Sequence, residues 1–86
     1  MKIKLSTILL NGFNEVSRHP DTRTLCTEGL NIRGNHVLRN FTINGDKITE
    51  TEVSRHCPAA LRAVSNSSIS DLLSLAPEGY SIEIDF

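Results

Sequence analysis

Tryptophan is absent from the 86-residue sequence, tyrosine occurs once and phenylalanine three times. So few aromatic side chains leave little for the base stacking on which single-stranded nucleic-acid binding depends. No apolar run approaches the ~20 residues that a membrane-spanning helix needs. The opening MKIKLSTILLNG carries two lysines before an apolar run, but the run is short and no small-residue cleavage site follows it. We therefore expect neither a signal peptide nor a membrane span, and we expect a cytoplasmic protein.

Cysteine is scarce too, and its spacing to histidine does not suit a metal site. Cys26 lies ten residues before His36, and His56 and Cys57 are adjacent. Zinc ligands usually come in close pairs such as C-x2-C or H-x3-H. Without a secretory signal, we also expect both thiols to be reduced rather than bridged. The sequence therefore predicts no metal and no disulfide.

Signatures of catalysis and of cofactor binding are missing as well. The sequence has no glycine-rich phosphate loop and no G-x-S-x-G turn. Cys57 could be combined with His19 or His36, but no local pattern supports a catalytic pair, and the adjacency of His56 alone is weak evidence. Glu50 and Glu52 share one face of an expected strand, where a solvated surface is the simpler interpretation. We expect a protein that is not an enzyme and that holds no cofactor.

Positive charge is lacking in the C-terminal part of the chain. All nine Lys and Arg lie in residues 1–62, although the net charge is only −1. The acids that follow residue 62 are Asp71, Glu78, Glu83 and Asp85. This distribution predicts a dipolar surface with an acidic edge. A chain of this length is expected to form one domain, residues 1–86.

The N-terminal segment allows two interpretations. Residues 2–5 alternate as a short strand, and the apolar residues that follow recur at helical spacing, with Ser6 as the N-cap of a helix over 6–18. Pro20 would end that helix. The alternative is one strand over residues 2–10 that turns at Asn11-Gly12. Residues 19–29 are expected to form a loop.

Two hairpin signals stand in the middle of the sequence. Gly34-Asn35 and Asn44-Gly45 are both typical of two-residue loops, and the strand expected between them covers residues 36–43. These two signals together predict a three-stranded meander over residues 29–53. With Asn44-Gly45 as the loop, Phe41 would face Ile48 and Arg39 would face Glu50.

The second of these signals competes with a helix signal, because Thr49-x-x-Glu52 has the form of a capping box. A helix that began there would be interrupted by Pro58 after about two turns. Residues 48–53 are also rich in β-branched side chains, which favour a strand. We expect the strand, with the start of a helix as the alternative.

The C-terminal third is expected to hold helices and a last strand. Pro58 suits the first turn of a helix over 58–64, and Ser68-x-x-Asp71 predicts the cap of a second helix that ends before Pro77. Residues 80–86 alternate, with Ser81, Glu83 and Asp85 expected to face outward. The fold class predicted is α+β: a small antiparallel sheet, made of the meander over 29–53 and the strand 80–86, with two or three short helices on one face.

These expectations favour a small regulator or inhibitor that binds another protein and occludes its surface. The candidate residues are the acidic edge and the hairpin arginines: Glu78, Glu83, Asp85, Arg33 and Arg39. An acidic edge would suit a partner with a basic surface. The C-terminal strand, if it lies at the sheet edge, could also pair with a second copy of the chain.

Nucleic-acid binding is the alternative. Arginine reads guanine edges and asparagine reads adenine edges, and a two-stranded ribbon fits the major groove. The residues that such a hairpin and its neighbours would use are Arg18, Arg23, Arg33, Asn35, His36, Arg39 and Asn40. The sequence pI of about 6.3 argues against this alternative.

Overall fold

The computed structural model describes residues 1–54 and 61–86, which form an α+β fold. The elements follow in the order β1 (Lys2–Lys4), α1 (Leu5–Leu10), β2 (Asn14–His19), β3 (Thr24–Leu30), β4 (His36–Asn44), β5 (Lys47–Ser54), β6 (Leu61–Ser68), α2 (Ile69–Leu75) and β7 (Ser81–Glu83).

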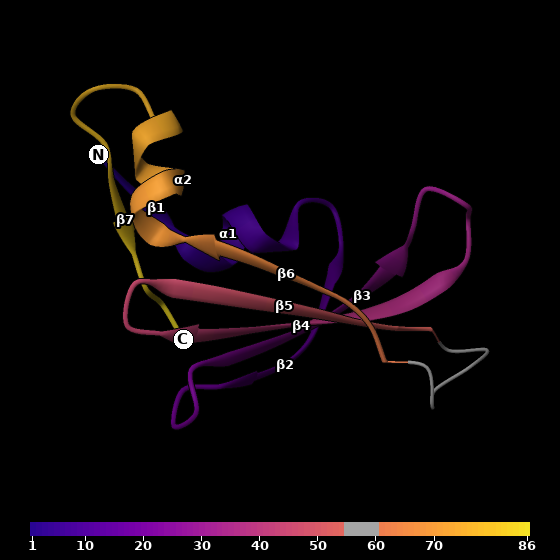
Figure 1. The fold of residues 1–86 in the computed structure, drawn as a ribbon. Helices are drawn as coiled ribbons and strands as arrows, with labels where there is room; N and C mark the ends of the chain where they lie inside the picture. Colours follow the sequence, from indigo (N-terminus) through magenta and orange to yellow (C-terminus); the bar gives the residue numbers. More distant parts are fainter. Residues whose placement is uncertain (55–60) are drawn as a thin grey trace.

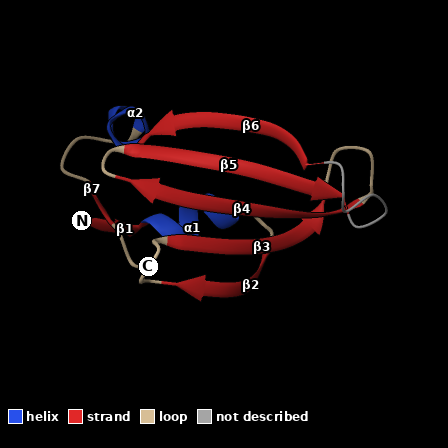
Figure 2. Ribbon diagram, turned by 60° about the horizontal axis from the view of Figure 1, so that its bottom comes forward, coloured by secondary structure: helices blue, strands red, loops and turns tan. Residues whose placement is uncertain are grey.

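Strands β2 to β6 form a five-stranded sheet in chain order, and each neighbouring pair is antiparallel (Figure 2). Strands β1 and β7 form a separate two-stranded parallel sheet. This small sheet and both helices lie on one side of the large sheet, at the end where the β4–β5 turn lies (Figure 1). We call α1, α2, β1 and β7 the helical lobe, and the side of the sheet that carries it the lobe face.

The β4–β5 hairpin confirms the strand interpretation of residues 48–53, but its register differs from the expected one. Asn44 pairs with Lys47 and Ile43 with Ile48, so the two-residue loop is Gly45-Asp46. Gly45 supplies the positive φ, 63°, at the first loop position rather than at the second. Every pairing therefore moves by two residues, which leaves each side chain on its expected face because strands alternate with period two.

The β3–β4 connection is longer than the expected two-residue turn at Gly34-Asn35. It comprises residues 31–35, because Leu30 pairs with His36. The side chain of Asn31 explains the difference, since its Oδ1 accepts hydrogen bonds from the backbone N–H groups of Arg33 (2.9 Å) and Asn35 (3.0 Å). Asparagine commonly stabilises loops by bonding to the backbone in this way.

Three further expectations need correction. The first helix ends at Leu10 because Asn11 (φ 41°) and Gly12 (φ 89°) are left-handed, so residues 14–18 belong to β2. The expected loop 19–29 contains most of β3. Residues 61–64 of the expected helix 58–64 are part of β6, since pairing with β5 overrides their helical propensity, and residues 58–60 lie outside the described chain.

The second helix forms as its capping signal predicts. Ser68 is the N-cap, and its Oγ accepts a hydrogen bond from the Asp71 N–H at 3.0 Å. Asp46 in the β4–β5 turn also accepts bonds from the N–H and hydroxyl of Ser70. These hydrogen bonds connect the first turn of α2 to the β4–β5 turn at the end of the large sheet.

The C-terminal strand is shorter than expected and lies elsewhere. Only Ser81–Glu83 are strand, and they pair with β1 in parallel rather than with the antiparallel sheet, whose edges are β2 and β6. Pairing of two copies through this strand stays a prediction, although the strand does not edge the large sheet. The chain then enters the core, where Phe86 is buried.

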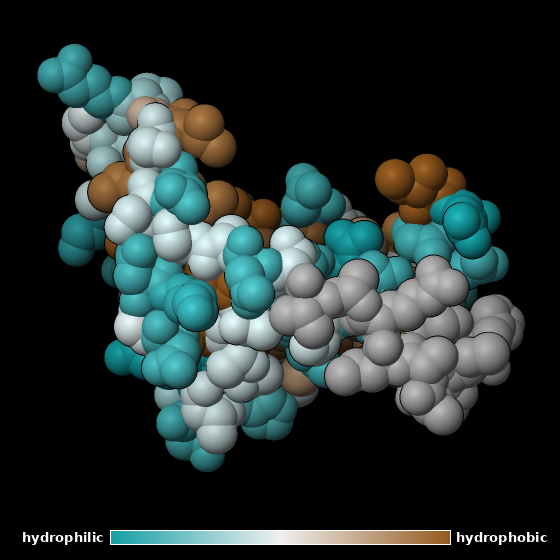
Figure 3. Space-filling model, viewed as in Figure 1, coloured by the Kyte–Doolittle hydropathy of each residue, from teal (hydrophilic) through white to brown (hydrophobic). Residues whose placement is uncertain are grey.

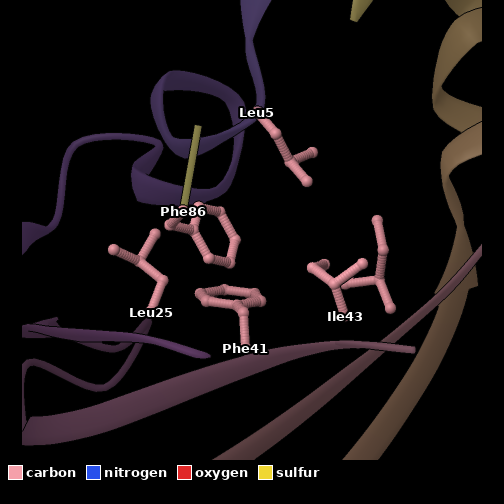
Figure 4. Packing of buried hydrophobic residues seen from close by; sticks show 6 residues of the cluster. Leu5, Leu25, Phe41, Ile43 and Phe86 are labelled. Atoms are coloured by element: carbon pink, nitrogen blue, oxygen red, sulfur yellow. The ribbon is translucent and has the colours of Figure 1, made fainter. Parts of the chain in front are cut away.

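The core lies between the large sheet and α1. Its members are Leu5, Leu25, Phe41, Ile43, Ile48 and Phe86. In Figure 4 the ring of Phe86 faces that of Phe41 on the sheet below it. Burying each such side chain stabilises the fold by roughly 1.5–3 kcal/mol. The core cluster occupies only the lobe end of the sheet; farther along the lobe face Thr27 and Val37 are buried too, whereas Arg39 between them and the core is partly exposed.

Candidate interaction surface

The half of the lobe face away from the core cluster centres on Arg39. Along β4, Arg39 follows Val37 and precedes the core residue Phe41 on the same face, so it lies between the core and the β3–β4 loop. Its Nε is 3.7 Å from a carboxylate oxygen of Glu50 and 3.6 Å from one of Glu52. Both distances are ion-pair distances and too long for hydrogen bonds.

The Arg39 guanidinium also stacks on an aromatic ring. Its central carbon is 4.5 Å from the ring centroid of Phe13, within the range of a cation–π contact. Nevertheless, Arg39 Nε is buried and has no hydrogen-bond partner among residues 1–54 and 61–86. An unsatisfied buried donor on a charged side chain costs free energy.

Gly29 on β3 positions Phe13. A Cβ added at Gly29 would lie 2.7 Å from Cγ of the Phe13 ring, so the ring rests directly on the backbone of the strand. Any side chain at position 29 would displace it. The glycine, the ring and the guanidinium therefore form one packed unit on the sheet.

Apolar side chains stand on both sides of this unit. In Figure 3 the surface is hollowed between the helical lobe and the β3–β4 loop, and apolar groups rise on each side. The fully exposed Ile32 (104%) belongs to the β3–β4 loop, whereas Leu73 and Leu75 (83% exposed) belong to α2. Exposed apolar groups that border a polar floor are typical of protein-binding surfaces. We call this region, with Phe13, Arg39, Glu50 and Glu52 as its floor, the hollow.

None of the described elements covers the opposite face of the sheet, which carries the apolar pair Leu38 and Val53 as well as polar side chains. Thr24 and Thr42 are cross-strand neighbours there, with their hydroxyl oxygens 3.4 Å apart. Cys26 and Asn40 pair in the next position of the same face, and Cys26 is a free thiol. Small uncharged side chains of this kind suit contact with water.

The residues expected to form the acidic edge do not all share one surface. Glu78 and Glu83 are exposed on the helical lobe, but Glu83 lies beside Lys4 in the β1–β7 register. Asp85 faces inward rather than outward, and its side chain is only 11% exposed. The strand ends at Glu83, so the alternation that predicted an outward Asp85 does not reach it.

Asp85 joins the chain end to two other elements. It accepts hydrogen bonds from the N–H (3.0 Å) and the hydroxyl of Ser6, and it pairs with Arg18 at 3.3 Å. Burial alone raises the pKa of the Asp85 carboxyl, but the bonds from Ser6 and the charge of Arg18 outweigh this effect, so the pKa lies below its usual value. These contacts give Asp85 and Arg18 a structural role.

The residues of the nucleic-acid alternative are spread over the molecule. Arg33, Asn35 and His36 lie at the β3–β4 loop, whereas Arg23 lies in the β2–β3 turn at the other end of the sheet. Arg39 and Asn40 are adjacent on β4 and so point to opposite faces. Arg18 is engaged by Glu15 and Asp85. No single face of the described chain gathers this set.

Sequence reasoning predicts that Arg39 faces Glu50, but it does not predict the contacts with Phe13 and Gly29. Phe13 falls within the helix expected over 6–18, whereas the structure has it between α1 and β2. Glu50 and Glu52 share a face, as alternation predicts, and that face also carries Arg39. The contact of Phe13 with Gly29 joins residues far apart in the chain, and no local pattern signals it.

Within the described part of the chain, no cluster of His, Cys, Asp and Glu has an arrangement that could hold a metal ion. No helix there is long and apolar enough to cross a membrane. No family model matches the sequence, and neither a curated protein nor a solved structure does.

Proposed function

We propose that this protein binds another protein through the hollow and acts by covering a surface of that partner, as a regulator or inhibitor does. The observation that carries the proposal is Arg39: a guanidinium that stacks on Phe13 between two carboxylates, on a side chain that stays 29% exposed. Arginines of this kind, enclosed by apolar groups, are typical anchors of protein interfaces.

The charges of the hollow indicate the partner's chemistry. Two carboxylates, Glu50 and Glu52, share one guanidinium, so the side chains described at the floor carry an excess of one negative charge. A basic side chain of the partner would balance this charge, and apolar groups beside it would meet Ile32 and Leu75. A partner that places a lysine or arginine between apolar side chains fits this arrangement.

Affinity capture from the organism's own lysate tests the proposal. Ile32→Ser removes an exposed apolar group (104%) of the hollow, and Val16→Ser removes another exposed apolar group (54%) from the β2 edge. We expect Ile32→Ser to reduce capture of a stoichiometric partner at least tenfold, and Val16→Ser to leave it unchanged. Circular dichroism checks that both variants fold. Equal capture by both variants would refute the use of this surface.

The nucleic-acid alternative lacks such support, because its residues do not share a surface. It is tested by binding to heparin or duplex DNA at about 50 mM salt, where a phosphate-binding protein should bind strongly. Arg33→Ala with Arg39→Ala should then abolish the binding.

A further inference from the structure

A second candidate site lies at the opposite end of the large sheet from the β3–β4 loop. A pocket of about 280 Å³ opens there between the β2–β3 turn, the β4–β5 turn and the C-terminal segment. It is lined by Arg23, Ile43, Gly45 and Ile84. Its walls are thus two isoleucines, the backbone of a turn and one cation.

Arg23 holds an unfavourable backbone conformation at this pocket. Its φ is 53°, in the left-handed region that glycine and asparagine tolerate and arginine rarely adopts. The conformation lets its carbonyl accept a hydrogen bond from the Ile43 N–H at 2.9 Å. Asparagine or glycine would make the same backbone bond with less strain, so the turn alone does not explain why arginine is present.

The Arg23 side chain has no structural task among the described residues. It is exposed and forms no ion pair there, in contrast to Arg18 and Arg39, each of which pairs with two carboxylates. A guanidinium without a counter-ion at the mouth of a pocket is suited to recognise an anion, and carboxylates match its paired donors best.

We propose that this pocket binds a carboxylate carried on a short aliphatic body. Ile43, which is buried, and Ile84 would contact the aliphatic part, and Arg23 would bind the carboxylate. Since one water occupies about 30 Å³ of liquid, the pocket has room for roughly nine non-hydrogen atoms. This chemistry is shared by a free short-chain carboxylic acid and by the C-terminal aliphatic residue of a polypeptide.

Titration followed by ¹⁵N NMR tests the proposal on the full chain. Hexanoate should cause saturable shifts of the backbone amides of Arg23, Ile43, Gly45 and Ile84. Hexanamide, which lacks the charge, and acetate, which lacks the aliphatic body, should each bind at least about tenfold more weakly. Equal binding of hexanoate and hexanamide, or shifts that do not saturate, would overturn the proposal.

Two variants and a control assign the binding to Arg23. Arg23→Gln keeps the length of the side chain without its charge, and Arg23→Asn also suits the left-handed backbone. Both variants should bind hexanoate at least about tenfold more weakly than the wild type. Arg33→Gln changes an exposed arginine in the β3–β4 loop and should leave the affinity for hexanoate unchanged. Unchanged binding in a folded Arg23→Asn variant would overturn the assignment. N-acetyl-leucine then distinguishes a polypeptide C-terminus from a free acid as the natural ligand. If it binds more tightly than hexanoate, the ligand is a polypeptide C-terminus; if it binds more weakly, the ligand is a free acid.

Discussion

The guanidinium carbon of Arg39 lies 4.5 Å from the ring centroid of Phe13, on the half of the sheet away from the core cluster. Phe13 in turn rests on the bare backbone of Gly29. Three segments of the chain thus meet in one packed unit that contributes little to the main core. This unit links the fold to the proposed function, because it holds the arginine that a partner would contact.

Gly29→Ala should destabilise the protein by about 1–3 kcal/mol, because the added methyl group would overlap the Phe13 ring. The φ of Gly29 is not in the left-handed region, so the backbone itself accepts alanine. Denaturant unfolding measures the loss. In a Phe13→Ala background the same substitution should cost less than about 0.5 kcal/mol. A full cost in that background would show that the contact is not responsible.

Asp85→Asn should lower the free energy of unfolding at pH 7 by about 1–3 kcal/mol, since it removes the charge that Ser6 and Arg18 stabilise. The pKa of Asp85 is lowered in the folded state, so its ionised form stabilises the fold above the unfolded pKa of about 3.9. That contribution disappears as the pH falls through the folded pKa.

The stability of the wild type should therefore decline more steeply below about pH 4 than that of the variant, and the two curves should converge in acid. Urea unfolding at a series of pH values measures this difference. Glu83→Gln, at an exposed neighbouring carboxylate, is the control and should follow the wild type. Parallel curves for Asp85→Asn and wild type would contradict the lowered pKa.

Ser68→Ala should cost about 1 kcal/mol, because it removes the side chain that caps α2. Ser67→Ala changes the preceding residue, which is exposed and caps nothing among the described residues, and should cost less than about 0.5 kcal/mol. Thermal unfolding compares them. Equal costs would mean that the bond from the Asp71 N–H does not stabilise the helix.

Arg23→Asn should raise the free energy of unfolding by up to about 1 kcal/mol, since asparagine tolerates the left-handed backbone better than arginine. Chemical denaturation measures the gain. The matched control is Arg33→Asn. The φ of Arg33 is not in the left-handed region, so this substitution should not raise the free energy of unfolding. A loss of stability in Arg23→Asn would mean that the arginine side chain itself supports the fold.

Local signals predicted the elements whose causes are local. Ser68 and Asp71 predicted the cap of α2, and Asn44-Gly45 with the β-branched residues after it predicted β5. The register of that hairpin was wrong by two residues because the sequence does not show which loop position Gly45 occupies. A shift of two residues leaves each side chain on the same face of the sheet, so Arg39, Glu50 and Glu52 could still be placed on one side.

The remaining errors concern interactions between distant segments. Residues 61–64 have helical propensity, yet they form a strand because β5 offers them a partner. Asp85 was expected to face outward, but Ser6 and Arg18 hold it inward across nearly the whole chain. The hollow depends on the same kind of contact, between Phe13, Gly29 and Arg39. Local periodicity carries no information about such contacts.

Site-specific photo-cross-linking tests the central claim most directly. A photoreactive residue is placed at Ile32 or Leu75, the exposed sides of the hollow, and at Thr51, which lies on the opposite face of the sheet. The proposal predicts that positions 32 and 75 cross-link to one and the same partner and that position 51 does not. Cross-linking of that partner from position 51, with none from 32 and 75, would contradict it.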